Sequence, residues 1–148
     1  MFDIHYQPSN RIDIDSLYRF LQSKSKEMDQ LYTLEMDDGL TLLQSAMLPR
    51  IITALAVLNN TKYLPTYDTD GHLSIDIMSL SDELLAEGVL NEDEVSMMRY
   101  VRHDANQIKH CAFEAHTANP VHVEQNFQAY SKLLDTLDDL YATYTMIH

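Results

Sequence analysis

The chain has 148 residues, 45% of them hydrophobic, which suits one domain with a sizeable core. Its formal net charge of −13 argues against non-specific nucleic-acid binding through a broad basic surface, but leaves open a basic protein partner or mimicry of nucleic acid. The single cysteine, Cys111, excludes an intramolecular disulfide and a cysteine-rich zinc site. Because the sequence shows neither a signal peptide nor a long apolar run, we expect a soluble, cytoplasmic protein with no membrane partner.

Residues that favour turns are scarce, with only 3 Gly and 4 Pro in the chain. This scarcity indicates a few long helices instead of many short strands. We therefore predict an all-α fold, an up-and-down bundle of about five helices. Residues 1–148 are expected to form a single helical domain, with residues 1–12 as a short N-terminal arm.

Apolar residues at helical spacing begin near the N-terminus. A first helix is predicted from Asp13 or Asp15 to a turn at residues 36–39, and a second from about Leu40 to Asn59. The second helix is apolar on nearly every side, which is typical of the central helix of a bundle.

The longest predicted loop precedes the third helix. Within it, residues 68–74 resemble the middle of an EF-hand calcium loop, but Thr66 and Ile77 stand where the first and last ligands are needed. We interpret this segment as an Asp/Gly turn. A third helix is predicted from Leu73 to Glu87, with Gly88 as its C-terminal stop.

The candidate site lies in the segment Asn91–His116, which has a helix-start signal. Asn91 can cap the helix, and Glu94 can reach back to it as in a capping box. On one side of this helix lie small apolar residues: Met98, Val101, Ala105, Ile108, Ala112 and Ala115. On the other side lie polar residues: Arg99, His103, Asn106 and His110, with Arg102 at their edge.

These five polar residues are the predicted ligand-binding set. Arginine holds phosphate oxygens in a planar fork, and histidine can move a proton near neutral pH, so the combination suits a phosphodiester. The alternative interpretation is a solvated helix face, as is usual for a polar side opposite an apolar one.

The segment Leu84–His110 resembles the signature region of the HEPN superfamily of helical bundles. Gly88-Val89-Leu90 is similar to the turn before the signature helix, and Arg102, Asn106 and His110 are similar to the polar triplet on it. The segment looks most like restriction-associated HEPN relatives and mannitol operon repressor-like proteins. This resemblance implies a HEPN-like helical bundle whose paired subunits bring their polar faces together.

The spacing of the polar residues departs from the catalytic pattern of that superfamily. Seven residues separate Arg102 from His110, and three separate Arg99 from His103. In the pattern of the ribonuclease members, the number of residues between the Arg and the His lies between these two values. We therefore favour a non-catalytic regulatory or protein-interaction module that binds a phosphate-bearing ligand or a basic protein partner. Whether the protein is an enzyme stays open.

Two alternatives remain. In a metal-independent ribonuclease or toxin-like protein, which would have RNA as its partner, Arg102 would hold the phosphate and His110 or His103 would act as acid and base. In an acidic inhibitor, the net charge would mimic nucleic acid.

Four histidines within 20 residues invite a metal hypothesis: His103, His110, His116 and His122. On one continuous helix, however, His103 and His110 stand two turns apart, too far to share one ion. We predict no metal and no cofactor, with a metal site formed between two helices as the alternative.

The last helix is predicted to start at Asn119-Pro120, because proline is favoured at the first helical position. It carries a heptad-like apolar stripe: Val123, Phe127, Tyr130, Leu134, Leu137, Tyr141 and Tyr144. A stripe this wide and rich in tyrosine indicates either deep burial or a dimer interface, and we predict a homodimer.

Overall fold

The computed structural model describes residues 12–61, 66–67, 73–74, 76–110 and 118–148. These residues form helices α2 (Ile14–Thr33), α3 (Asp37–Leu58), α4 (Ile77–Ala86), α5 (Glu92–His110) and α6 (Pro120–Ile147), and strands β1 (Thr66–Tyr67) and β2 (Leu73–Ser74). Helices account for most of the described chain, so the predicted all-α class is confirmed.

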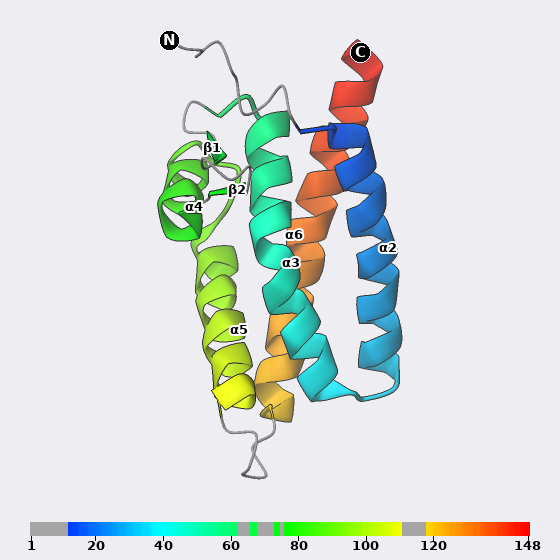
Figure 1. The fold of residues 1–148 in the computed structure, drawn as a ribbon, viewed down its shortest axis with the longest axis vertical. Coiled ribbons are helices and arrows are strands. Elements are labelled where there is room, and N and C mark those ends of the chain that lie inside the picture. Colours follow the sequence, from blue (N-terminus) through cyan, green and yellow to red (C-terminus); the bar gives the residue numbers. More distant parts are fainter. Residues whose placement is uncertain (1–11, 62–65, 68–72, 75, 111–117) are drawn as a thin grey trace.

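Helix α3 is the centre of the bundle and packs against α2, α4, α5 and α6. In Figure 1 the chain runs down α2, up α3, down α5 and up α6, which is the predicted up-and-down arrangement. The short helix α4 lies above α5, next to the small antiparallel ladder of β1 and β2.

The core is built around the all-round apolar surface of α3. Several of its side chains are fully buried: Leu40, Leu48, Ile51, Ile52, Ala54, Leu55 and Ala56. Among the described helices, only α3 is long and apolar enough to cross a membrane, and 61% of its most apolar window is buried inside the bundle. The core helix of a soluble protein has the same length and composition, so these properties follow from its central position.

Two predicted helix boundaries are confirmed by local hydrogen bonds. The Asn119 side chain accepts from the Val121 backbone N–H at 2.9 Å, directly before α6 begins at Pro120. After α4, Gly88 adopts a φ of +78°, and the Val89 N–H bonds back to the Leu84 carbonyl at 2.9 Å. This is a glycine-ended helix, as its sequence indicates.

The predicted start of the third helix is wrong. Leu73 and Ser74 form β2, where they pair with Tyr67 and Thr66 of β1, and α4 begins only at Ile77. The cause is local: the Asp76 carboxylate accepts from the Ser79 backbone N–H at 3.2 Å and from its hydroxyl at 2.9 Å. Asp76 is therefore the N-cap, and a cap cannot lie inside its own helix.

Two further predicted features fall outside the described residues. They are the N-terminal arm, apart from Ile12, and residues 68–72 of the calcium-loop-like segment. The predicted signature helix also extended to His116, whereas α5 ends at His110 and residues 111–117 are likewise outside the description.

The apolar stripe of α6 packs against other helices of the same chain. Val123, Tyr130 and Leu137 are buried, and Phe127 and Tyr141 stack on tyrosine rings of α2. Of the two interpretations of this stripe, deep burial accounts for it without a partner subunit.

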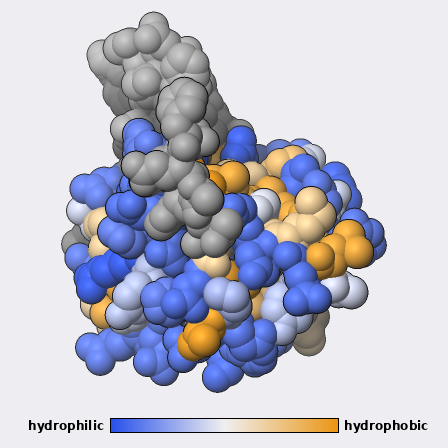
Figure 2. Space-filling view, turned by 90° about the horizontal axis from the view of Figure 1, so that it is seen from below, coloured by the Kyte–Doolittle hydropathy of each residue, from blue (hydrophilic) through white to orange (hydrophobic). Residues whose placement is uncertain are grey.

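Hydrophilic residues dominate the end of the molecule shown in Figure 2, and hydrophobic residues appear there only in small separate patches. Elsewhere on the described surface, the most exposed large apolar residues are Met146 and Ile147 at the end of α6. Isolated apolar residues of this kind are normal on a soluble surface.

Candidate functional site

The start of α5 is held by a complete capping box. The Asn91 side chain accepts from the Glu94 N–H at 2.8 Å, and the Glu94 carboxylate accepts from the Asn91 N–H at 2.9 Å. This reciprocal pair satisfies two backbone donors at the helix start and defines the orientation in which α5 leaves the turn. The predicted cap is therefore confirmed.

The capped helix buries its apolar side against α3 and α6. Met98, Val101 and Ala105 are at most 1% exposed, and Met97 is buried beside them. The opposite side carries the predicted ligand-binding set, here named the α5 face: Arg99, Arg102, His103, Asn106 and His110. Arg102 is half-buried and the other four are exposed, so the sequence spacing correctly separated the two sides.

Electrostatic contacts of the α5 face are sparse. The pKa of Asp76 is lowered mainly by its hydrogen bonds from Ser79, with a smaller contribution from the charge of Arg102. Within the described part of the chain, the other four side chains of the α5 face make no hydrogen bond or ion pair. Their donors are therefore available to an external partner.

The histidines of the α5 face have no orienting partner within the described ranges. A catalytic base is normally oriented by a second group hydrogen-bonded to its ring, and neither His103 nor His110 has such a group among the described residues. The grooves described below are lined by other residues. The structure thus brings the five residues together on one exposed helix side.

A groove lies beside this face, between α5 and α6. Its volume is about 410 Å³, and its lining includes two buried polar side chains, Glu94 and Asn126, with Tyr100 and Lys132. Burial raises the pKa of the Glu94 carboxyl, against the opposing effects of the Asn91 N–H and the Lys132 charge. A carboxyl with a raised pKa in a groove is a recurrent feature of binding sites.

Sequence reasoning identified Glu94 only as a cap and missed Asn126. A signal for Asn126 was present, because it stands within the apolar stripe of α6, between Val123 and Tyr130. Folding buries the side-chain amide of a polar residue at such a position, and buried polar groups need a hydrogen-bond partner.

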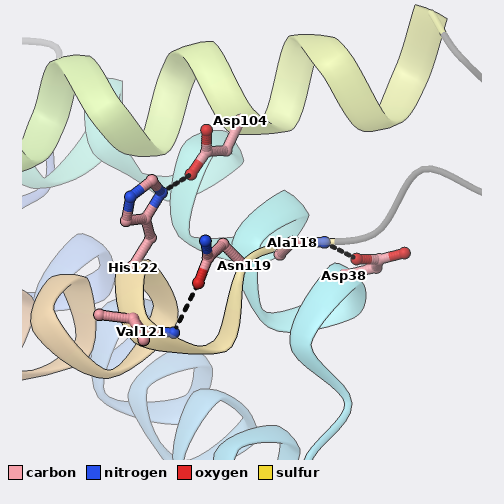
Figure 3. Close-up of polar contacts among 6 residues, drawn as sticks. All are labelled: Asp38, Asp104, Ala118, Asn119, Val121 and His122. Atoms are coloured by element: carbon pink, nitrogen blue, oxygen red, sulfur yellow. Dashed lines mark hydrogen bonds and ion pairs between the residues drawn. The ribbon is translucent and has the colours of Figure 1, made fainter.

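The far end of α5 meets the beginning of α6 (Figure 3). His122 Nδ1 lies 4.0 Å from a carboxylate oxygen of Asp104, and the His122 and Tyr100 rings are 6.3 Å apart. Beside them the Ala118 N–H donates to the Asp38 carboxylate at 2.8 Å, which ties the entry of α6 to the first turn of α3. Asp104 and His122 therefore link the two helices.

No group of three or more His, Cys, Asp or Glu side chains that could hold a metal ion occurs within the described ranges. His116, one of the four clustered histidines, and Cys111 lie outside them.

The chain was compared with known protein families, with curated proteins and with solved structures, and none of them matches it.

Proposed function

We propose that this protein is a non-catalytic interaction module that binds a phosphate-bearing partner through the α5 face. One observation carries the proposal. The α5 face presents Arg99 and Arg102 to solvent while its two histidines have no orienting partner among the described residues. Such a surface can bind phosphate oxygens, but it holds no acid or base in a defined position.

The charge distribution supports the same choice. Residues 99–110 contain three of the chain's ten Lys and Arg but only one carboxylate, that of Asp104. The molecule as a whole carries a net charge of −13, so an anionic partner is repelled by most of its surface. Attraction is confined to one helix side, which favours a local contact over a broad non-specific one.

The resemblance of Leu84–His110 to the HEPN superfamily points in the same direction. Its off-pattern Arg–His spacing supports a binding role better than a ribonuclease role. The phosphate recognition proposed for exposed Arg99 and half-buried Arg102 needs only guanidinium groups at the surface, which do not depend on that spacing.

The test is the salt dependence of binding to a short labelled RNA, with Arg99→Gln/Arg102→Gln as the variant. Each lost phosphate contact should reduce the slope of log affinity against log salt by roughly 0.7, and the affinity should fall at every salt concentration. The matched control is Arg19→Gln/Arg50→Gln, which removes the same charge from exposed positions on α2 and α3. An equal fall in the control would contradict a site on α5.

The same samples decide between binding and cleavage. We expect intact RNA after prolonged incubation with the native chain. RNA cleavage that disappears in His110→Ala would instead establish the ribonuclease alternative, with Arg102 and His110 in the roles described above.

A further inference from the structure

Helices α2 and α6 lie side by side (Figure 1), and aromatic side chains of the two helices stack between them. At one end the rings of Tyr18 and Tyr141 stack with centroids 3.7 Å apart, and at the other Tyr32 and Phe127 stack at 3.8 Å. Each stack therefore acts as a spacer between the two helix backbones.

The tyrosine hydroxyls strengthen these spacers by donating across the gap. Tyr18 donates to Asp138 at 2.7 Å, Tyr141 donates to Asp15, and Tyr32 donates to Glu124. Hydrogen bonds to carboxylates are stronger than those between neutral groups, so the spacing of α2 and α6 is well defined at both ends.

Between the two ring stacks runs a trough, here named the α2–α6 trough. It consists of two adjoining cavities of about 180 Å³ each, which share Ser25, Leu134 and Asp138. The lining extends from Tyr18 to Asp29 on α2 and from Phe127 to Asp138 on α6. At the rise of an α-helix, each wall is about 16 Å long, so the trough suits an elongated occupant.

A buried amide lines the trough from α3. Gln44 is only 2% exposed, and its side-chain Nε2 has no hydrogen-bond partner. The nearby Tyr130 hydroxyl donates to the Gln44 backbone carbonyl at 2.9 Å and makes no hydrogen bond with Nε2. Buried polar groups are rarely left unpaired, so this amide points to a missing ligand.

The other lining groups define the chemistry of that ligand. Asp29, Asp135 and Asp138 place carboxylates on both walls, and Met28 and Leu134 provide apolar surface between them. Since nothing accepts from Gln44 Nε2, the amide can rotate by half a turn and present its carbonyl oxygen to a donor. The trough therefore places several hydrogen-bond acceptors at intervals, with aliphatic side chains between them.

We propose that the α2–α6 trough binds a linear aliphatic polyamine. Its protonated amines pair with Asp29, Asp135 and Asp138, and its methylene segments lie along Met28 and Leu134. A lysine side chain of a partner protein carries one ammonium and would leave most of these carboxylates unpaired. A compact metal ion is also a poor match, since no metal-holding cluster occurs among the described residues.

Two lysines limit where the amines can lie. Lys26 lines only the cavity that includes Tyr18 and repels a cation there, whereas Lys24 is paired with Glu27 at 2.7 Å. The amines are therefore expected beside Asp29 and Asp135, in the cavity that has no lysine in its lining. This site is separate from the α5 face and does not depend on the proposed function.

Calorimetric titration of the full chain with spermidine at low ionic strength tests the proposal. Asp29→Asn/Asp135→Asn should weaken binding about tenfold, because it removes two of the carboxylates that pair with the amines. Both side chains are exposed, so the change leaves the core intact. The matched control, Asp82→Asn/Asp139→Asn, removes the same charge from exposed positions outside the trough and should change affinity less than about twofold. Equal weakening in both double variants would show general attraction to an acidic protein and overturn the proposal.

Nuclear magnetic resonance locates the ligand independently of any variant. The side-chain amide signals of Gln44 should shift on adding spermidine and stay in place with triethylene glycol, a neutral chain of similar length. Displacement of spermidine by an equal charge concentration of Mg²⁺, or a Gln44 amide that does not shift, would overturn the site. Gln44→Met, which keeps the side-chain length without the amide, should weaken binding about fivefold.

Discussion

Gly88 and Gly39 differ in what a methyl group would do to them. Gly88 has a φ of +78°, where a side chain strains the backbone although no atom lies within 4 Å of the added carbon. In Gly39, inside α3, the added carbon would meet only Leu31 Cδ2 at an ordinary 3.7 Å. We expect Gly88→Ala to lower the free energy of unfolding by about 1 kcal/mol, and Gly39→Ala to raise it by roughly 0.5 kcal/mol. Urea unfolding followed by circular dichroism measures both, and shifts of the same sign would contradict the backbone assignments.

Glu94 links burial to pH at the residue scale. Burial is the main cause that raises its pKa above 4.5. At pH values between 4.5 and the raised pKa, the folded chain therefore binds a proton more readily than the unfolded chain. The stabilisation from this proton is present below pH 4.5 and is lost as the pH rises through the raised pKa. Glu94→Gln keeps an acceptor for the Asn91 N–H but carries no charge, so its stability should depend less on pH across this window.

Denaturant unfolding at several pH values between about 4 and 7 tests this expectation. The control is Glu92→Gln, which removes an exposed charge from the same helix turn and should leave the slope unchanged. Parallel pH profiles for the native chain and Glu94→Gln would show that burial of Glu94 does not govern the slope.

At the scale of the elements, α2 is attached to α6 by its ring stacks. A double-mutant cycle of Tyr18→Leu and Tyr141→Leu should give a coupling free energy of about 0.5–1.5 kcal/mol, because the two rings stack directly on each other. A second cycle of Tyr18→Leu with Phe127→Leu should give nearly none, since Phe127 stacks on Tyr32 at the opposite end. Equal coupling in the two cycles would mean that α2 responds as a whole instead of through separate contacts.

Assembly belongs to the scale of the whole molecule. The α6 stripe is buried within the chain, so the predicted homodimer rests on the α5 face alone. Two such faces would gather four arginines, and these would repel one another unless an anion lay between them. We therefore expect dimers at micromolar concentration that phosphate stabilises. Sedimentation that shows a monomer both with and without phosphate would contradict the predicted dimer. It would also contradict a ribonuclease site shared between subunits.

The features that the sequence alone determined depend on neighbours within one helical turn. The cap of Asn91 with Glu94, the start of α6 at Pro120 and the stop at Gly88 are satisfied by hydrogen bonds that reach no farther than five residues. The two sides of α5 were equally readable, because helical periodicity separates Val101 from Arg99 whatever packs against the helix.

Contacts between distant segments needed the tertiary structure. Helical spacing did not reveal that Leu73 and Ser74 pair with β1, although the Asp76 cap that starts α4 is a local signal. Periodicity identified the α6 stripe as apolar, yet only packing showed that α2 and the core contact it. Gln44 is the clearest case: its sequence position shows a polar residue in an apolar helix, but an unpaired amide beside a trough exists only once α2, α3 and α6 are assembled.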